Sequence, residues 1–218
     1  MKRTIMTACM ALLVVMAATA QERVTLPQPN KKVKMTLFDA LQQRASVREY
    51  AAKPVSDRVL SQLLWAACGV NRRGSAASQG FGAGNTDIRI TAPSAINAQD
   101  ITVYVCREDG AWRYDARAHA LEKVSSKDLR EAVADRQPFA KEAPVSLVLV
   151  SDVSKVRNHS EFGAMDAGYV SENICLACTA LGLATVPRAS MDKDVLAREL
   201  GLGPSEQLML NNPVGYPK

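Results

Sequence analysis

Residues 145–150 read V-S-L-V-L-V, and this almost continuous apolar run constrains the fold more than any other segment. A strand that alternates apolar and polar residues can leave one face in water, whereas a continuously apolar strand needs cover on both faces. The run therefore predicts a buried central strand. Residues 161–182 form the longest helical pattern, carry apolar residues on more than one side and end at Gly182, so this helix also requires burial on several sides.

The remaining elements mix helices and strands without strict alternation, which predicts an α+β fold in which helices flank a mixed sheet. Thr36 and Asp39 form a capping box that starts a helix. Ser56 and Gly69 bound a second helical pattern. Shorter helices are expected over 128–135 and 194–200, the latter ended by Gly201. Strands are expected over 101–105, 111–114, 120–124 and 207–216.

The first 20 residues have the pattern of a secretory signal peptide. Lys2 and Arg3 precede a mostly apolar run over 5–15, and Ala18-Thr19-Ala20 has the small-x-small cleavage pattern. The apolar run is short for a membrane span, although an uncleaved N-terminal anchor is the alternative. We therefore expect an exported protein, periplasmic or secreted, without a membrane segment after cleavage. The domain boundaries are 1–20 for the leader, 21–35 for a polar tether and 36–218 for one domain.

Charge and cysteine content argue against several classes of function. The net charge of +5 falls to +3 without Lys2 and Arg3, which gives no electrostatic case for nucleic acid. Four cysteines remain after the leader: Cys68, Cys106, Cys175 and Cys178. They lie in apolar segments and are expected to be buried small hydrophobic residues, and no metal site is predicted. Cys175 and Cys178 have the spacing of a redox or metal motif, but they lie in the middle of a helix with no second pair or nearby histidines.

An alternating Arg44-x-Ser46-x-Arg48 pattern follows the first helix. In an extended segment these three side chains point to one face. A guanidinium group binds phosphate through two parallel hydrogen bonds, and a serine hydroxyl adds a donor, so the pattern suits an anion. A solvated basic edge is the structural alternative.

Two more polar segments accompany this pattern. Residues 91–99, TAPSAINAQ, place Ser94, Asn97 and Gln99 just before a strand. The amide groups of Asn97 and Gln99 suit a heterocycle edge, although an ordinary capped turn is the alternative. Residues 184–190, ATVPRAS, follow the long helix, where small residues would let backbone N–H groups approach a ligand. Residues 69–87 are rich in glycine and serine and are interpreted as a long loop, either a functional lid or disordered.

Taken in this order, with DAGYVSENICLACTALGLATVP and a late V-G-Y-P, the segments resemble the FMN-dependent nitroreductase superfamily over residues 36–217. The resemblance implies FMN bound at a homodimer interface. It implies that Arg44, Ser46 and Arg48 contact the phosphate or ribityl chain. Asn97 would face the pyrimidine edge, Ser94 would also bind the cofactor, and the loop of Pro187, Arg188, Ala189 and Ser190 would offer a backbone N–H near flavin N5, from Ala189.

The chain departs from the family pattern at two places. Many members carry an acidic residue and glycine after the loop proline, where this chain has Arg188-Ala189-Ser190. Many also continue past Gly-Tyr-Pro into a basic segment, whereas this sequence ends at Lys218, which is then the remaining candidate for that phosphate contact. Arg89, before the T-A-P-S segment, is a candidate for steering an anionic substrate.

The resemblance implies an FMN oxidoreductase that takes two electrons from a reduced donor, NAD(P)H, and passes them to a nitroaromatic, quinone or similar small acceptor. Flavin chemistry requires no acid–base side chain from the protein, and His119 and His159 are expected to be surface residues. Two alternatives stay open. One is an exported flavin-binding protein without nicotinamide-linked turnover. The other is a flavin dehydrogenase acting on a peptide heterocycle, as in the thiazoline-oxidase-like branch.

Overall fold

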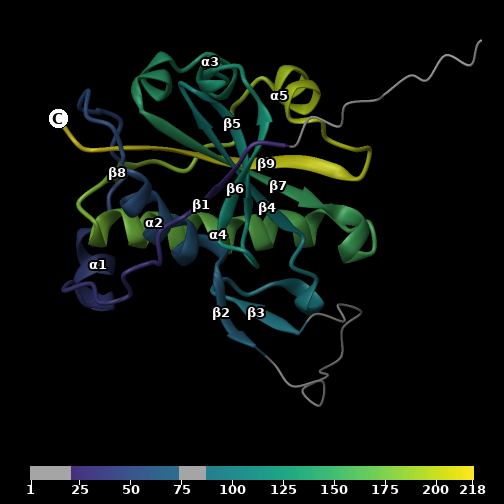
Figure 1. Ribbon diagram of the computed structural model, residues 1–218, viewed down its shortest axis with the longest axis horizontal. Helices are drawn as coiled ribbons and strands as arrows, with labels where there is room; N and C mark the ends of the chain where they lie inside the picture. Colours follow the sequence, from purple (N-terminus) through teal and green to yellow (C-terminus); the bar gives the residue numbers. More distant parts are fainter. Residues whose placement is uncertain (1–20, 74–86) are drawn as a thin grey trace, which may run out of the picture.

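A computed structural model describes residues 21–73 and 87–218, and the leader therefore lies outside the described residues. Its main sheet has seven strands in the order β1-β6-β5-β4-β7-β9-β8. In chain order these are β1 (Arg23–Thr25), β4 (Ile101–Arg107), β5 (Gly110–Asp115), β6 (Ala120–Ser125), β7 (Val145–Asp152), β8 (Ala184–Thr185) and β9 (Glu206–Gly215). Helices cover both faces, so the predicted α+β class with a helix-flanked sheet is confirmed (Figure 1).

The central position of β7 confirms the strand predicted from V-S-L-V-L-V. β7 pairs antiparallel with β4 on one side and β9 on the other, and every residue from Val145 to Ser151 is buried. Leu147 and Leu149 pack into the core cluster that α4 (Ser160–Ala180) covers, and Val148 and Val150 pack into the cluster under α5 (Lys193–Leu200). The continuous apolar run follows from this cover on both faces.

The helices begin and end where their sequence signals predict. Thr36 and Asp39 form the expected capping box at the start of α1 (Leu37–Gln43). The other helices are α2 (Asp57–Cys68), α3 (Arg130–Ala134), α4 and α5, and Gly201 caps α5 in the left-handed conformation. α2 and α4 pack on one face of the sheet, while α3 and α5 lie on the other (Figure 1). No helix of the described residues is long and apolar enough to cross a membrane.

One side of the α1–α4 layer leaves large apolar side chains in solvent. Val170 and Ile174 of α4 are buried, as its apolar composition requires. Phe162, Met165 and Tyr169 of the same helix are exposed, as are Leu37, Phe38 and Leu41 of α1, and 81% of Phe38 is exposed. Large exposed apolar side chains gathered on two neighbouring helices are typical of a surface that binds another protein.

The N-terminal segment 21–35 differs from the expected polar tether. Residues Arg23–Thr25 form β1, which pairs antiparallel with β6, and Leu26 is buried in the main core. His119, expected at the surface, helps to hold this segment, because its Nε2 lies 2.7 Å from Ser61 Oγ and 3.1 Å from Pro27 O. β1 has only three residues, too few to show an alternation of apolar and polar side chains, so the strand can be recognised only from its pairing with β6.

A separate two-stranded sheet projects from the domain beside α4. It consists of β2 (Val70–Arg73) and β3 (Ile88–Ile90), paired antiparallel (Figure 1). The loop predicted over 69–87 therefore begins with a strand, and its residues 74–86 lie outside the described residues. A 3₁₀ helix, η1 (Ala95–Asn97), connects β3 to β4.

Candidate functional site

The Arg44–Arg48 segment lies between β8 and the C-terminus. The backbone N–H of Val47 donates to Thr185 O at 3.0 Å, and that of Ala51 donates to Tyr216 O at 2.8 Å. Tyr50 forms an antiparallel bridge with Pro217. These bonds hold the segment extended, with Arg44 half-buried and with Ser46 and Arg48 exposed. The structure thus places the predicted phosphate segment next to the strand that leads into the 187–190 loop.

Arg44 and Arg48 present positive charge without acidic partners. Neither forms an ion pair with a residue in the described ranges. Burial, and then the charge of Glu172, raise the pKa of the Cys175 thiol to about 11, and the charge of Arg44 partly opposes this rise. Helix α1, which ends just before Arg44, packs against α4. A half-buried guanidinium without a carboxylate is costly unless an anion compensates it, so this corner of the molecule fits a phosphate group.

Lys218 reaches the same side of the molecule. Its neighbour Pro217 is bridged to Tyr50, so the last residue lies near the Arg44–Arg48 segment. Its ammonium group forms an ion pair with Glu142 at 3.4 Å. Both side chains are more than half exposed, so this pair is weak and Lys218 can exchange Glu142 for another anion.

The loop after β8 alternates between outward and inward residues. Pro187 and Ala189 are exposed, whereas Arg188 is buried. The backbone N–H and C=O of Arg188 pair with Asn211 at 2.8 and 2.7 Å. No hydrogen bond engages the Ala189 N–H within the described part of the chain. Ala189 therefore has the free backbone donor that the sequence assigned to this loop.

The Arg188 side chain has a structural role that the sequence did not indicate. Its guanidinium donates to the carbonyls of Val133 and Ala134 at 3.0 and 2.8 Å, to Asn211 Oδ1 at 2.9 Å and to Gln137 Oε1 at 3.0 Å. These bonds tie the loop to the end of α3. The side chain is directed into the protein rather than to the exposed face of the loop, so a cofactor contact from this residue is not supported by its geometry.

The Ser94–Gln99 turn is strained and firmly held. Ile96, Asn97 and Gln99 have positive φ values of 48°, 56° and 50°, and a β-branched residue such as isoleucine rarely adopts this conformation. Ser94 Oγ accepts from the Gln99 N–H at 2.8 Å, and Asn97 Oδ1 accepts from Gln99 Nε2 at 3.2 Å. Ser94 thus closes the turn, while the Asn97 amide nitrogen has no acceptor among the described residues. Strain of this kind is concentrated at functional sites.

Two buried carboxyl groups support this turn from below. Both oxygens of Asp166 accept from the Ala95 N–H, at 3.1 and 2.9 Å. Asp100 Oδ2 accepts from Ser151 Oγ at 2.5 Å, and its Oδ1 has no donor in the described ranges. Burial, and then a hydrogen bond with Asp166, raise the pKa of Asp100 to about 6. No local sequence pattern indicates this pair, because its two members are 66 residues apart and meet only in the fold.

The phosphate segment and the Ser94–Gln99 turn lie at different places along α4. Ala95 is bound to Asp166 near the start of α4, whereas Arg44 follows α1, which packs against α4. Figure 1 shows α1 at one end of α4 and β2–β3 further along it. One chain therefore brings Arg44, Arg48, Lys218 and Ala189 into one region, and Ser94 and Asn97 into another.

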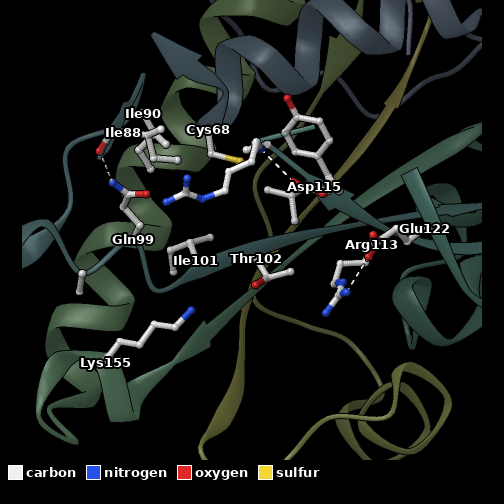
Figure 2. Close-up of a pocket in the computed structure, with 15 residues that line it drawn as sticks. Cys68, Ile88, Ile90, Gln99, Ile101, Thr102, Arg113, Asp115, Glu122 and Lys155 are labelled. Carbon is white, nitrogen blue, oxygen red and sulfur yellow. Dashed lines mark hydrogen bonds and ion pairs between the residues drawn. The ribbon is translucent and has the colours of Figure 1, made fainter. Parts of the chain in front are cut away.

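Strand β3 separates two hollows in the surface. On one side lies a cleft of about 470 Å³, where Ile88, Ile90 and Ile101 form an apolar wall (Figure 2). Among its charged side chains, Arg113 pairs with Glu122 at 2.6 Å. On the other side lies a cavity of about 240 Å³ lined by Arg89, Ser94 and Asn97. The structure therefore places the candidate substrate residue Arg89 beside the turn assigned to the flavin ring.

The cysteines provide no separate chemistry. All four are free and buried, as expected, and burial raises the pKa of Cys68 and Cys106 to about 12, which keeps them as thiols. In the described ranges, no group of histidine, cysteine and acidic residues could hold a metal ion. The site therefore consists of hydrogen-bond donors and cations without a side-chain nucleophile, an arrangement that suits a bound cofactor that does the chemistry itself.

Comparison with known proteins agrees with this interpretation. Residues 41–216 match the model of the nitroreductase family. A candidate nitroreductase of Methanocaldococcus jannaschii is 31% identical over 194 residues, which cover 82% of this chain and 90% of that protein. The crystal structure of a candidate nitroreductase from Ralstonia eutropha JMP134 is 33% identical, with a TM-score of 0.77, and the match covers 92% of this chain and 91% of that one.

A more distant structure shows the same fold. It is a candidate nitroreductase from Desulfovibrio desulfuricans in complex with FMN, 22% identical with a TM-score of 0.58, and the match covers 84% of this chain and 87% of that chain. The fold and the donor-rich site define a flavin-dependent oxidoreductase, the class of enzyme expected from the sequence. The chain belongs to the nitroreductase family, which confirms the resemblance.

Proposed function

We propose that this protein binds FMN and transfers two electrons from a reduced nicotinamide, NAD(P)H, to a nitroaromatic, a quinone or a similar small acceptor. The observation that carries the proposal is the pair Arg44 and Arg48, two cations without acidic partners in the described ranges, beside a loop with a free backbone donor. A phosphate bound at this place would compensate the half-buried charge of Arg44. FMN is a flavin that carries such a phosphate.

Each group has a definite task toward the cofactor. Arg44, Ser46 and Arg48 bind the phosphate or the ribityl chain, and Lys218 adds a second cation when it leaves Glu142. Ala189 offers its N–H to the ring near N5, and Ser94 and Asn97 serve the pyrimidine edge. Bound FMN accepts and donates a hydride at N5, and the protein supplies position and electrostatics.

A homodimer would join the two parts of the site. The regions around Arg44 and Asn97 lie at different places along α4 in one chain. The exposed apolar side chains of α1 and α4 lie on the same layer of the molecule. In a C2 dimer the same surface of both protomers forms the interface. A dimer built on these apolar side chains could therefore bring the turn of one protomer close to the phosphate segment of its partner. FMN would then be bound at the subunit interface.

The N-terminal sequence supports export of the protein to the periplasm or the medium. The basic start, the short apolar run and Ala18-Thr19-Ala20 together have the form of a cleavable leader. Residues Arg23–Thr25 already belong to the sheet, so the cleavage site lies close to the folded domain. Mass spectrometry of the N-terminus of the protein expressed with its leader tests this: a mature chain that begins near Gln21 is expected, and an intact leader would indicate an anchor.

The direct test of the function is spectroscopic. The purified mature protein is titrated with FMN, and NADPH or NADH is then added under nitrogen. Quenching of flavin fluorescence and bleaching of the yellow colour are expected, followed by reoxidation on adding a nitroaromatic or quinone. Protein that binds FMN but is inert to both nicotinamides would act with a different donor or only bind flavin. Protein that binds no FMN would contradict the proposal.

A further inference from the structure

One buried carboxyl group, that of Asp166, holds both ends of the turn that carries Asn97. Asp166 lies on α4 with 1% of its surface exposed, and both of its oxygens accept from the Ala95 N–H, at 3.1 and 2.9 Å. At the other end, Asp100 directly follows Gln99, and a hydrogen bond with Asp166 is, after burial, the second cause that raises the pKa of Asp100. Among the described residues, no other hydrogen bond ties the turn to α4.

The helix comes close to the turn because a glycine faces the sheet one turn before Asp166. A Cβ added at Gly163 would overlap with Ser151 Oγ, so glycine is what leaves room for the contact between α4 and β7. Ser151 in turn donates to Asp100 at 2.5 Å. Residues three apart lie on the same side of a helix. The close approach at Gly163 therefore brings Asp166 to the level of the turn.

The turn depends on such a hold because its backbone is strained. Ile96, Asn97 and Gln99 have φ values of 48°, 56° and 50°, in the left-handed region that a β-branched residue rarely adopts. The Gln99 side chain ties the turn to β3, where its Nε2 donates to Ile88 O at 2.9 Å (Figure 2). Strained backbone persists only where its surroundings over-determine it. Without an acceptor for the Ala95 N–H, Ile96 can relax toward negative φ, and this rotates Asn97.

We propose that Asp166 is a positioning residue for the flavin, which through Ala95 fixes the turn in the conformation that directs the Asn97 amide to the pyrimidine edge. This inference rests on the proposed function, because it takes Asn97 as a ring contact. Asn97 Oδ1 accepts from Gln99 Nε2 at 3.2 Å, which leaves the amide NH₂ group as the donor for the ring. A donor at this edge stabilises the negative charge of reduced flavin. Asp166 therefore affects the midpoint potential of the flavin through Asn97.

The test compares the midpoint potential of FMN bound to the wild type and to matched variants, by dye-equilibrated reductive titration. Asp166→Ala removes the acceptor, and Asp166→Asn retains one oxygen for the Ala95 N–H. Asn97→Ala removes the proposed ring contact, and the double variant shows whether the two residues act through one contact. Asp128→Ala is the matched control. Asp128 also accepts from a backbone N–H, that of Arg130 at 3.0 Å, and it lies before α3 on the other face of the sheet.

Asn97→Ala and Asp166→Ala should each weaken the binding of reduced FMN relative to oxidised FMN by about tenfold, which lowers the midpoint potential by about 30 mV for a two-electron couple. The double variant should have the potential of Asn97→Ala alone, because the two losses are not independent. Asp166→Asn should recover most of the potential, and Asp128→Ala should equal the wild type. An unchanged potential in Asp166→Ala, or losses that add in the double variant, overturns the inference even where the melting temperature falls.

A variant of Ala95 breaks the same hydrogen bond from the donor side. Ala95→Pro has no N–H to donate and leaves both carboxyl groups in place. Ser94 already has the extended backbone that a residue before proline requires, with φ −146° and ψ 135°. This variant should lower the potential as Asp166→Ala does, so the test holds even if Asp166→Ala does not fold. Folded Ala95→Pro with the wild-type potential contradicts the inference.

Hydrogen exchange of the protein without FMN separates this inference from the proposed function. The N–H groups of Asn97 and Gln99 both donate to Ser94 within the turn. They should exchange about tenfold faster in Asp166→Ala than in the wild type and Asp128→Ala, because the turn opens locally. If FMN fails to bind but this difference is present, the hold of Asp166 on the turn stands and the proposed function falls. If FMN binds and neither exchange nor potential changes, the positioning role is contradicted and the proposed function stands.

Discussion

Asp100 and Asp166 meet in the interior as a pair of carboxyl groups, with 0% and 1% of their surfaces exposed. They lie directly beneath the strained turn that carries Asn97, and Asp166 holds that turn through the Ala95 N–H. Ser151 is the donor to Asp100, and no cation of the described residues forms an ion pair with either carboxyl group. A buried carboxylate beside a second carboxyl group is costly to ionise, so Asp100 is expected to hold its proton more tightly than an exposed aspartate.

This pair should make the free energy of unfolding depend on pH. Burial, and then Asp166, raise the pKa of Asp100 to about 6, whereas an unfolded aspartate titrates near about 3.9. The folded state therefore binds the proton more tightly, and its contribution is complete below about pH 4 and is lost as the pH rises through about 6. The loss is at most about 3 kcal/mol at 1.36 kcal/mol per pKa unit. Asp100→Asn should flatten this decline, as measured by urea unfolding at pH 4.5 and pH 7.

The control for Asp100→Asn is Asp194→Asn, which changes the net charge equally at an exposed position on α5. It should retain the wild-type dependence on pH. If Asp100→Asn and the wild type lose the same stability between pH 4.5 and pH 7, then the titrating group is not Asp100.

The phosphate site predicts weaker FMN binding when its cations are removed. Loss of one charge-assisted hydrogen bond costs about 1.5–3 kcal/mol. Arg44→Ala and Arg48→Ala should therefore each raise the Kd for FMN by about ten- to a hundredfold, at about 1.4 kcal/mol per tenfold. Fluorescence titration measures the Kd. Arg198→Ala on α5, on the other face of the sheet, is the matched control and should leave it unchanged; unchanged values in both site variants would reject the site.

Arg188 should affect stability rather than act through direct contact with the flavin. Its guanidinium is bound to two backbone carbonyls, Asn211 and Gln137, and only 6% of the residue is exposed. Arg188→Ala leaves these acceptors buried without a donor, which should cost about 3 kcal/mol or more. At roughly 2–4 °C per kcal/mol, the melting temperature of the protein without FMN should fall by at least about 6 °C. A melting temperature equal to that of Arg198→Ala would contradict the structural role.

The regular elements could be predicted from the sequence, because their signals are local. The period of α4, the capping box at Thr36 and the continuous apolar run of β7 each occur within one segment, and the structure confirms them. The short strand β1 has no such signal, since three residues define no period. Its existence depends on β6, almost one hundred residues away.

The candidate site could be predicted only in part for the same reason. Alternation places Arg44, Ser46 and Arg48 on one side of an extended segment, and that can be inferred without a structure. The burial of Arg188 cannot, because its acceptors come from α3 and β9.

The exposed apolar surface predicts a homodimer that single charges should disrupt. Phe38 on α1 and Met165 on α4 are 81% and 53% exposed, and exposed side chains of this size are typical of a subunit interface. Aspartate at either position would have to lose its hydration when the surfaces meet, which is costly for an unpaired charge. Light scattering should give twice the chain mass for the wild type and one chain mass for Phe38→Asp and Met165→Asp. Lys193→Asp, on α5 at the other face of the sheet, should remain dimeric. FMN is proposed to bind across the interface, so both monomeric variants should also bind FMN at least about tenfold more weakly than the wild type. Without FMN, their melting temperatures should fall only by the amount that loss of the dimer itself causes. A wild type that is monomeric at micromolar concentration and still binds FMN would contradict both the dimer and the shared site.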